Sequence, residues 1–408
     1  MLKNESSSGV ILQETGGRIF FILAPLWLTS FVVSCQLFLV APLLPLIQDG
    51  LLNAVSPSDF SLGFLGTAYS IALACSTLIV GPISDRVGRR LVLIIGTAFI
   101  ALILLLHGAA RHYESLLAVR ALAGIAAGVY SGSMVAFVGD YFPYERRGWA
   151  TGLILTGAAC GQIIGTPGGI LLANAYEFQT PFIVFGGLMA LASGMIWRYL
   201  PKRHVNHEGK QTSALNTYGM LLRSKGPRAG VLVYFFLFAS IGFFVFFLPK
   251  WLEEDVGISV QQLALIFIIG GMAMVLGTTS GGTLSDRFGR KPIIVIASLV
   301  MVLILPFVIL LVDGLISAAV VIALILVSGA MRTGPIIALL TTLTTDKQRG
   351  SMMGLATASG QLGLGVATAT AGWLYDYHGF AYNVLACTVV TVLMVLVVWR
   401  QLPEPTEA

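Results

Sequence analysis

The ten residues GPISDRVGRR, at positions 81–90, separate two long apolar stretches, and they recur as GTLSDRFGRK at positions 282–291. Both copies contain an Asp-Arg pair, a glycine and two further basic residues, and the offset between them is 201 residues. Two further pairs of segments are offset by 202 residues, namely RG at 147–148 with RG at 349–350, and WRYLP at 197–201 with WRQLP at 399–403. Such a constant period indicates an internal duplication, and it predicts two structurally equivalent halves.

The composition around these motifs excludes a soluble protein. Of the 408 residues, 56% are hydrophobic, only 11% are charged and 46 are glycine, and the mean hydropathy is +0.88. Twelve membrane-spanning helices need about 240 residues without strongly polar side chains. This chain has enough such residues for twelve spans and few for any other domain. A large water-soluble domain, a nucleic-acid partner and a soluble enzyme are therefore excluded, and we expect no enzymatic activity.

Apolar stretches bounded by proline, glycine and charged residues predict twelve helices, because they are too long and too evenly apolar for the strands of a β-barrel. The predicted spans are 19–42, 60–80, 91–109, 116–138, 149–172, 180–200, 229–248, 261–280, 293–312, 315–340, 350–373 and 382–399. A polar linker at 201–228 divides the chain into a first half, 1–200, and a second half, 229–408. We expect an all-α membrane protein made of two six-helix bundles.

The placement of lysine and arginine predicts the orientation in the membrane. With the N-terminus in the cytoplasm, 20 of the 24 basic residues fall on the inner side, Arg111 and Lys250 lie outside, and Arg120 and Arg332 lie within spans. Positive residues concentrate on the cytoplasmic side of membrane proteins. We therefore expect a multi-pass protein of the plasma membrane, such as a bacterial inner membrane, with both termini in the cytoplasm. The four cysteines lack metal-ligand spacing, and we expect neither a metal nor another cofactor.

The motif at 81–90 resembles the signature G-x-L-x-D-R-x-G-R-K/R of the major facilitator superfamily of secondary transporters, and the copy at 282–291 lies at the corresponding junction of the second half. The resemblance covers essentially the whole chain. It implies twelve helices in two pseudo-symmetric bundles related by an axis along the membrane normal. It also implies a monomer in the lipid bilayer that moves a small-molecule substrate by alternating access, with protons as the coupling ion.

The two copies of the motif are candidates for a cytoplasmic gate. Their aspartates can accept charge-assisted hydrogen bonds from arginines or helix N-termini, so the clusters can latch the bundles together when the cavity opens outward. The alternative is a purely topological role, in which the basic residues keep the loops inside. If the latch exists, Asp85→Asn strongly reduces transport and leaves the protein in the membrane. The expected gate residues are Gly81, Asp85, Arg86, Gly88, Arg89, Arg90, Gly282, Asp286, Arg287, Gly289, Arg290 and Lys291.

The span 149–172 carries glycine at every fourth position on one face, which allows close approach of another helix, and Pro167 introduces a kink. The four glycines are Gly157, Gly161, Gly165 and Gly169. The run resembles the motif G-x-x-x-G-P-x-x-G-G of drug:proton antiporters, except that Thr166 stands in place of the proline and Pro167 comes one residue late. We expect this segment to be a conformational hinge, and the resemblance implies export by antiport. Ordinary close helix packing is the alternative.

Arg120 and Arg332 are functional candidates because a charge within a span costs about 3 kcal/mol or more unless it is compensated. Arg120 resembles the fourth-helix arginine motif that proton-coupled exporters of the superfamily use, although Ala123 replaces the usual glutamine. Arg332 precedes a Gly-Pro pair that breaks helices, and its counterpart in the repeat is Tyr130 or Ser131. The alternative for both arginines is a snorkelling or carbonyl-bonded side chain.

No aspartate or glutamate lies in the middle of a predicted span, which weakens the case for a cationic drug as substrate. Two guanidiniums favour an anionic or neutral amphipathic solute instead. Asp140, at the inner end of the fourth span, is either a proton-relay or gate residue or a plain helix-end charge. We predict proton-coupled export of a small organic or drug-like solute, with uptake or exchange of an organic anion as the alternative. The expected substrate or proton pathway comprises Arg120, Tyr130, Asp140 and Arg332.

Overall fold

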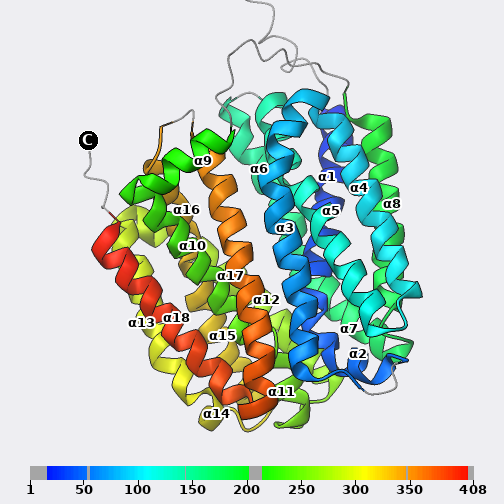
Figure 1. Cartoon of the computed structure of the whole chain (residues 1–408), viewed down its shortest axis with the longest axis vertical. Helices are drawn as coiled ribbons and strands as arrows, with labels where there is room; N and C mark the ends of the chain where they lie inside the picture. The colour runs from blue at the N-terminus through cyan, green and yellow to red at the C-terminus, as the bar shows by residue number, and fades with distance from the viewer. Residues whose placement is uncertain (1–15, 53–55, 143, 202–213, 346–347, 403–408) are drawn as a thin grey trace, which may run out of the picture.

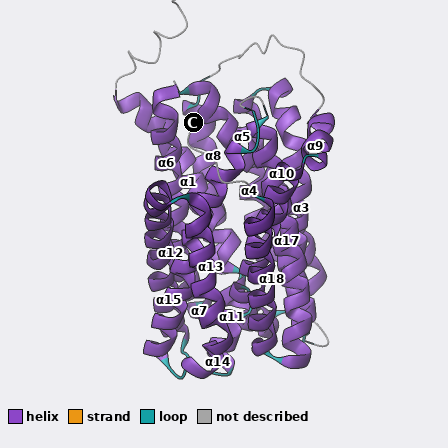
Figure 2. Ribbon diagram, turned by 90° about the vertical axis from the view of Figure 1, so that its left-hand side faces the viewer, coloured by secondary structure: helices purple, strands orange, loops and turns teal. Residues whose placement is uncertain are grey.

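The computed structural model describes residues 16–52, 56–142, 144–201, 214–345 and 348–402, and these residues form helices and connecting turns with no strand among them (Figure 1, Figure 2). The first bundle consists of α1 (Gly16–Leu39), η1 (Ala41–Leu43), α2 (Leu44–Gly50), α3 (Asp59–Val87), α4 (Arg89–Leu106), η2 (His107–Ala109), α5 (Tyr113–Tyr141), α6 (Tyr144–Cys160), η3 (Gly161–Gly165), α7 (Thr166–Ala175) and α8 (Thr180–Tyr199).

The second bundle follows the short helix α9 (Ala214–Arg223), which lies within the stretch expected as a linker. It consists of α10 (Lys225–Val245), α11 (Leu248–Glu254), α12 (Val260–Phe288), α13 (Arg290–Ile304), η4 (Leu305–Phe307), α14 (Val308–Leu311), α15 (Leu315–Met331), α16 (Thr333–Thr342), α17 (Arg349–His378) and α18 (Phe380–Gln401). Each predicted span thus coincides with a helix or with consecutive helices.

In the described part of the chain, 11 helical stretches are long and apolar enough to cross a membrane. The remaining long helix, α17, has 30 residues and coincides with the span expected at 350–373, but glycine and threonine lower its apolarity. It packs along α3 and α10, so much of its surface faces protein instead of lipid. A helix enclosed in this way does not need a uniformly apolar surface.

The repeated motif forms the same turn twice, which confirms the predicted duplication. Helices α3 and α12 both have 29 residues, and each ends at a glycine of the motif, Gly88 or Gly289. These glycines have φ of 99° and 90°, a backbone conformation that a Cβ atom disfavours. The next helix begins at the following residue in both copies, so the glycine permits the reversal between two long helices.

The two bundles lie side by side, with the first on the right and the second on the left of Figure 1. Helices α3 and α17 pack closely along this boundary, where Thr67 Oγ1 donates a hydrogen bond of 2.8 Å to the carbonyl of Gly365. Gly372 is also required here, because a Cβ atom on it would lie 2.5 Å from the carbonyl oxygen of Asp59. A second contact joins α12 to η3 and α7. Both contacts bring segments of opposite halves together.

Candidate functional site

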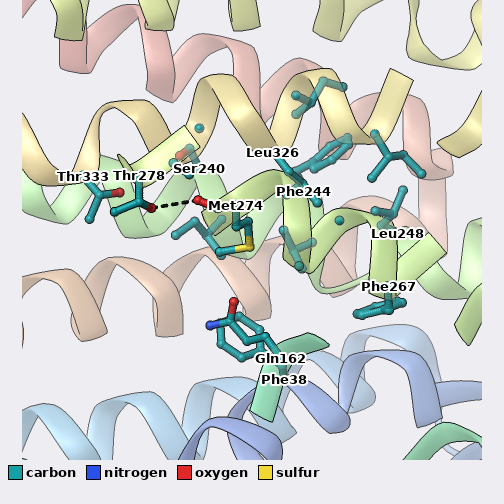
Figure 3. Close-up of a pocket in the computed structure, with 18 of the residues that line it drawn as sticks. Phe38, Gln162, Ser240, Phe244, Leu248, Phe267, Met274, Thr278, Leu326 and Thr333 are labelled. Atoms are coloured by element: carbon teal, nitrogen blue, oxygen red, sulfur yellow. Dashed lines mark hydrogen bonds between the residues drawn. The ribbon is translucent and has the colours of Figure 1, made fainter. Parts of the chain in front are cut away.

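A cavity of about 210 Å³ lies between the bundles (Figure 3). Helices α10, α12 and α15 of the second bundle form most of its wall, and the first bundle contributes Phe38, Gln162 and Thr166. One part of the wall is apolar and includes Phe244, Leu248 and Phe267, which lie toward the right of Figure 3. Ser240, Thr278 and Thr333 lie together in another part, as Figure 3 shows, and Arg332 also lines the cavity. The cavity therefore suits a ligand that is itself amphipathic.

Arg332 supplies the charge in this cavity. It lies at the break between α15 and α16, where Pro335 cannot donate a backbone hydrogen bond to the preceding turn. The residue is 1% exposed, its Nε donates to the carbonyl of Gly329 at 3.3 Å, and its Nη2 donates to Ser240 Oγ at 3.3 Å. Nη1 has no hydrogen-bond partner among the described residues. Since no carboxylate lines the cavity, the guanidinium retains the capacity to bind an anionic or hydrogen-bond-accepting ligand.

Arg120 and Tyr130 are buried on α5, and neither lines this cavity. The guanidinium carbon of Arg120 lies 4.5 Å from the centre of the Tyr69 ring, and Nη1 donates to the carbonyl of Gln36 at 3.3 Å. Tyr130 donates its hydroxyl to the carbonyl of Leu26 at 3.4 Å. Of the two predicted arginines, the structure thus brings only Arg332 to the cavity.

The described contacts of the signature motifs and of Asp140 stay within their own bundle. Arg89 Nε donates to Asp140 Oδ2 at 2.9 Å, which joins α4 to α5, and Arg90 donates to the carbonyl of Trp197. In the second copy, Arg290 donates to the carbonyl of Ala338 on α16, Lys291 donates to the carbonyls of Trp399 and Leu402, and Asp286 and Arg287 are exposed. Positions 81, 85 and 86 lie outside the residues whose side chains the structure describes. The latch between the bundles stays a prediction.

The glycine ridge of the fifth span packs against α1. A Cβ atom on Gly161 would lie 2.5 Å from the carbonyl oxygen of Phe31, and one on Gly169 would lie 2.7 Å from Leu39 Cδ1. Gly157 meets the carbonyl of Trp27 and Gly165 meets Cys35 in the same way. The predicted close approach of a helix therefore occurs, and the partner is the first span.

The same span contains a π-helix, η3, which the sequence analysis missed. The N–H of Thr166 donates to the carbonyl of Gly161, five residues back, and Thr166 Oγ1 and Cys35 Sγ donate to the same oxygen at 3.3 Å and 3.5 Å. A proline at position 166 would lack the N–H that closes this turn. The departure from the antiporter pattern, with threonine before Pro167, is the sequence feature that permits the π-helix.

A second missed feature is a buried ion pair that joins the bundles at the α2/α11 end of the molecule, the lower end in Figure 1. Lys250 on α11 is 3% exposed, and its Nζ contacts the carboxylate of Asp59 and the side-chain oxygen of Gln48, the latter at 2.9 Å. Asp376 on α17 accepts hydrogen bonds from the N–H groups of Asp59 and Phe60 at 3.2 Å and 3.1 Å. We call Gln48, Asp59, Lys250 and Asp376 the interbundle lock.

The chain matches the family model of the Major Facilitator Superfamily over residues 26–332 and again over 230–408. The chain belongs to the major facilitator superfamily. It is accordingly a multi-pass membrane transporter and not an enzyme. This superfamily member is 28% identical over 280 residues to the uncharacterised MFS-type transporter YceJ of Bacillus subtilis, a match that covers 68% of this chain and 70% of YceJ. It is 26% identical over 293 residues to the multidrug resistance protein MdtG of Salmonella typhi, with the same coverage of 68% and 70%.

Solved transporter structures share the fold of this superfamily member. A D-xylose–proton symporter superposes with a TM-score of 0.80 at 18% identity, covering 95% of this chain and 98% of the symporter. A bacterial homologue of the human lysosomal transporter Spinster gives a TM-score of 0.74 at 14% identity, with coverage of 96% and 100%. At these identities the likeness concerns the fold, and it agrees with the predicted pair of pseudo-symmetric six-helix bundles.

Proposed function

We propose that this transporter exports a small amphipathic organic solute by alternating access, coupled to protons, across a bacterial inner membrane. The observation that carries the proposal is the amphipathic cavity between the bundles, with the buried Arg332 in its wall. The glycine ridge with Pro167 resembles the motif of drug:proton antiporters, and MdtG, named a multidrug resistance protein, is among the relatives. These features favour export over other activities of the superfamily.

The interbundle lock supports alternating access. It ties α2 and α3 to α11 and α17, so it holds the two bundles together at one end. The excess of basic residues in the opposite loops favours an outer location for the α2/α11 end, with both termini in the cytoplasm. In this arrangement the described conformation is closed toward the outside. Transport then requires the lock to separate so that the substrate leaves on that side.

Proton coupling needs a group that changes its interactions between the two conformations. Arg120 is our candidate, because it is 2% exposed and is compensated by the Tyr69 ring and a carbonyl without a carboxylate among the described residues. Tyr130 and Asp140 are further candidates for the proton pathway, since each contacts a second helix of the first bundle. Fifth-span glycines supply the hinge in this scheme.

A second candidate function is uptake or exchange of an organic anion through an arginine-centred site. The unpartnered Nη1 of Arg332 favours it, because a carboxylate or phosphate group binds a guanidinium through charge-assisted hydrogen bonds. The cavity wall contains no carboxylate that would neutralise the arginine. The two candidates share the site and differ in the direction of transport.

Transport by energised inverted membrane vesicles distinguishes these candidates. A panel of small anionic, neutral and cationic aromatic compounds is supplied outside the vesicles, and the accumulated amount is measured with and without an uncoupler. Export predicts accumulation that collapses with the uncoupler and that Arg332→Ala reduces. Uptake predicts accumulation in right-side-out vesicles only. A lack of uncoupler-sensitive accumulation in vesicles of either orientation contradicts proton-coupled export.

A further inference from the structure

The π-helix η3 contributes a polar side chain of the first bundle to the wall of the cavity. Gln162, its second residue, lines the cavity and is only partly buried. Figure 3 shows its amide group directed toward the cavity, on the side of Met274. The amide makes no hydrogen bond within the described part of the chain. A free amide donor and acceptor of the first bundle therefore lines the same cavity as Arg332 of the second bundle.

The backbone of η3 sets the position of this amide. A π-turn places one more residue in the turn than an α-helix does, so it alters the direction of the side chains it carries, and such turns are frequent at functional sites. The bonds from Thr166 and Cys35 to the carbonyl of Gly161 stabilise the turn. The sequence thus maintains an irregular turn at the one place where the fifth span meets the cavity.

The neighbouring residues of η3 join both sides of the interface. Ile163 fills the space over Gly271 of α12, where a Cβ atom would lie 2.8 Å from Ile163 Cγ1. Gly161 and Gly165, at the two ends of the turn, contact α1. A single turn therefore touches the cavity, the second bundle and the first span. A ligand bound to Gln162 would therefore contact the turn at which the two bundles pack against each other.

The chemistry of the cavity defines a ligand that would use both polar groups. Arg332 can donate hydrogen bonds to one anionic group of a ligand. The cavity wall has no carboxylate, which disfavours a cationic group. Phe244, Leu248 and Phe267 accommodate an apolar body. The amide of Gln162 can then donate to or accept from a second polar group of the same ligand.

We propose that Gln162 is the residue through which the first bundle recognises the substrate, and that the substrate is an amphipathic monoanion with a second hydrogen-bonding group. The inference rests on the proposed function, because it takes the cavity as the transport site. A hydrogen bond of this kind contributes about 0.5–1.5 kcal/mol, which corresponds to a preference of roughly 2- to 13-fold for ligands that carry the second group.

Binding to the purified full-length protein in detergent tests this proposal. The probes are n-alkanoates of six, eight and ten carbons and the matching ω-hydroxyalkanoates, and the Kd of each is measured from the change in tryptophan fluorescence. We expect Gln162→Leu to remove the wild-type preference for the hydroxylated member of a pair, a change of roughly 2- to 13-fold in the ratio of the two Kd values. Arg332→Ala should weaken both members of each pair equally.

Gln162→Asn is the second variant, because it keeps the amide but shortens the side chain by one methylene. We expect it to move the preferred ω-hydroxyalkanoate toward a longer chain, a shift that a merely structural effect would not produce. Ile164→Leu, at an exposed position of the same turn, is the matched control and should leave every Kd unchanged.

Two results overturn the proposal. One is an equal Kd ratio in the wild type and in Gln162→Leu, which leaves the arginine site intact but removes Gln162 from recognition. The other is the absence of binding for every chain length, which rejects the substrate class. A failure of the proposed export appears separately, as missing uncoupler-sensitive accumulation in the vesicle assay, so the two failures are distinguishable.

Discussion

Three lysine or arginine side chains are buried in the described part of this transporter, and each is compensated differently. Lys250 contacts the carboxylate of Asp59, Arg332 donates to a carbonyl and a hydroxyl, and Arg120 lies over the ring of Tyr69. A buried charge without such partners would be costly, so every one of these contacts constrains a side chain. Arg120 and Arg332 each keep one buried guanidinium nitrogen without a described partner, Nε and Nη1 respectively. Arg332 lines the cavity and Arg120 does not, and this difference is the reason that we assign ligand binding to Arg332.

Replacement of the aromatic ring beside Arg120 tests the compensation of this arginine. We expect Tyr69→Leu to lower the free energy of unfolding by about 2 kcal/mol, since a desolvated guanidinium loses its cation–π partner. Tyr69→Phe keeps the ring and should lower the free energy of unfolding by clearly less than Tyr69→Leu does. Thermal unfolding of the purified variants in detergent measures the difference. Equal losses in the two variants would show that the ring does not stabilise the arginine.

At the scale of elements, small residues decide which helices approach closely. The glycines of the fifth span allow contact with α1, and Gly365 and Gly372 of α17 allow contact with α3. Close packing of helices through small residues is a common source of stability in membrane proteins, where apolar burial from water contributes little between spans. The π-helix lies within one of these glycine-rich contacts, so its irregular backbone is enclosed by α1 and α12.

A matched pair of alanine substitutions tests the glycine contact with α1. Gly161→Ala would place a Cβ atom 2.5 Å from the carbonyl oxygen of Phe31, so we expect it to destabilise the protein by about 1–3 kcal/mol and to reduce transport. Gly168→Ala, seven residues further along, meets open space and should leave both properties nearly unchanged. The measurements are thermal unfolding and vesicle transport. Similar effects of the two substitutions would argue against close packing as the role of the ridge.

At the scale of the whole molecule, a duplicated scaffold surrounds an asymmetric site. The repeat relates α3 to α12 and the glycine turns to each other, yet most of the cavity wall belongs to the second bundle. Arg332 corresponds by the 202-residue offset to Tyr130, which donates to a carbonyl of α1 instead of lining the cavity. In the proposed mechanism, the symmetric scaffold would carry the movement of the bundles, and recognition would depend on residues that the repeat does not preserve.

Removal of one partner from the interbundle lock should open the α2/α11 end. Loss of Asp59 removes the carboxylate of the first bundle from the buried ammonium of Lys250, which then keeps Gln48 and, at 3.7 Å, Glu254 of its own helix. We expect Asp59→Asn and Lys250→Met to shift the population toward conformations in which this end is separated. Spin labels at Leu52→Cys and Leu310→Cys, both exposed positions near this end, report the separation as longer distances in electron paramagnetic resonance.

The controls for this prediction use the same end of the molecule. Asp49→Asn removes an exposed carboxylate of α2 and should leave the distance distribution unchanged. The double exchange Asp59→Lys with Lys250→Asp should restore part of the short distances, because it re-forms an opposite-charge pair. Unchanged distances in both single variants of the lock would refute its role in closure.

The sequence by itself determined the twelve spans, the duplication and the two arginines within spans. These properties are local or periodic, since apolar length, backbone freedom and charge act within a few residues of where they occur. They also sufficed to predict the family.

Only the tertiary structure decided that Arg332 lines the cavity while Arg120 does not, that Lys250 pairs with Asp59 at a separation of 191 residues, and that η3 presents Gln162 to the opposite bundle. The physical reason is the rotation of each helix about its own axis. In a span that is apolar on every side, hydropathy does not mark the face that meets a neighbour. Packing of small residues and pairing of buried polar groups set that rotation, and these contacts form only when segments far apart in the chain come together.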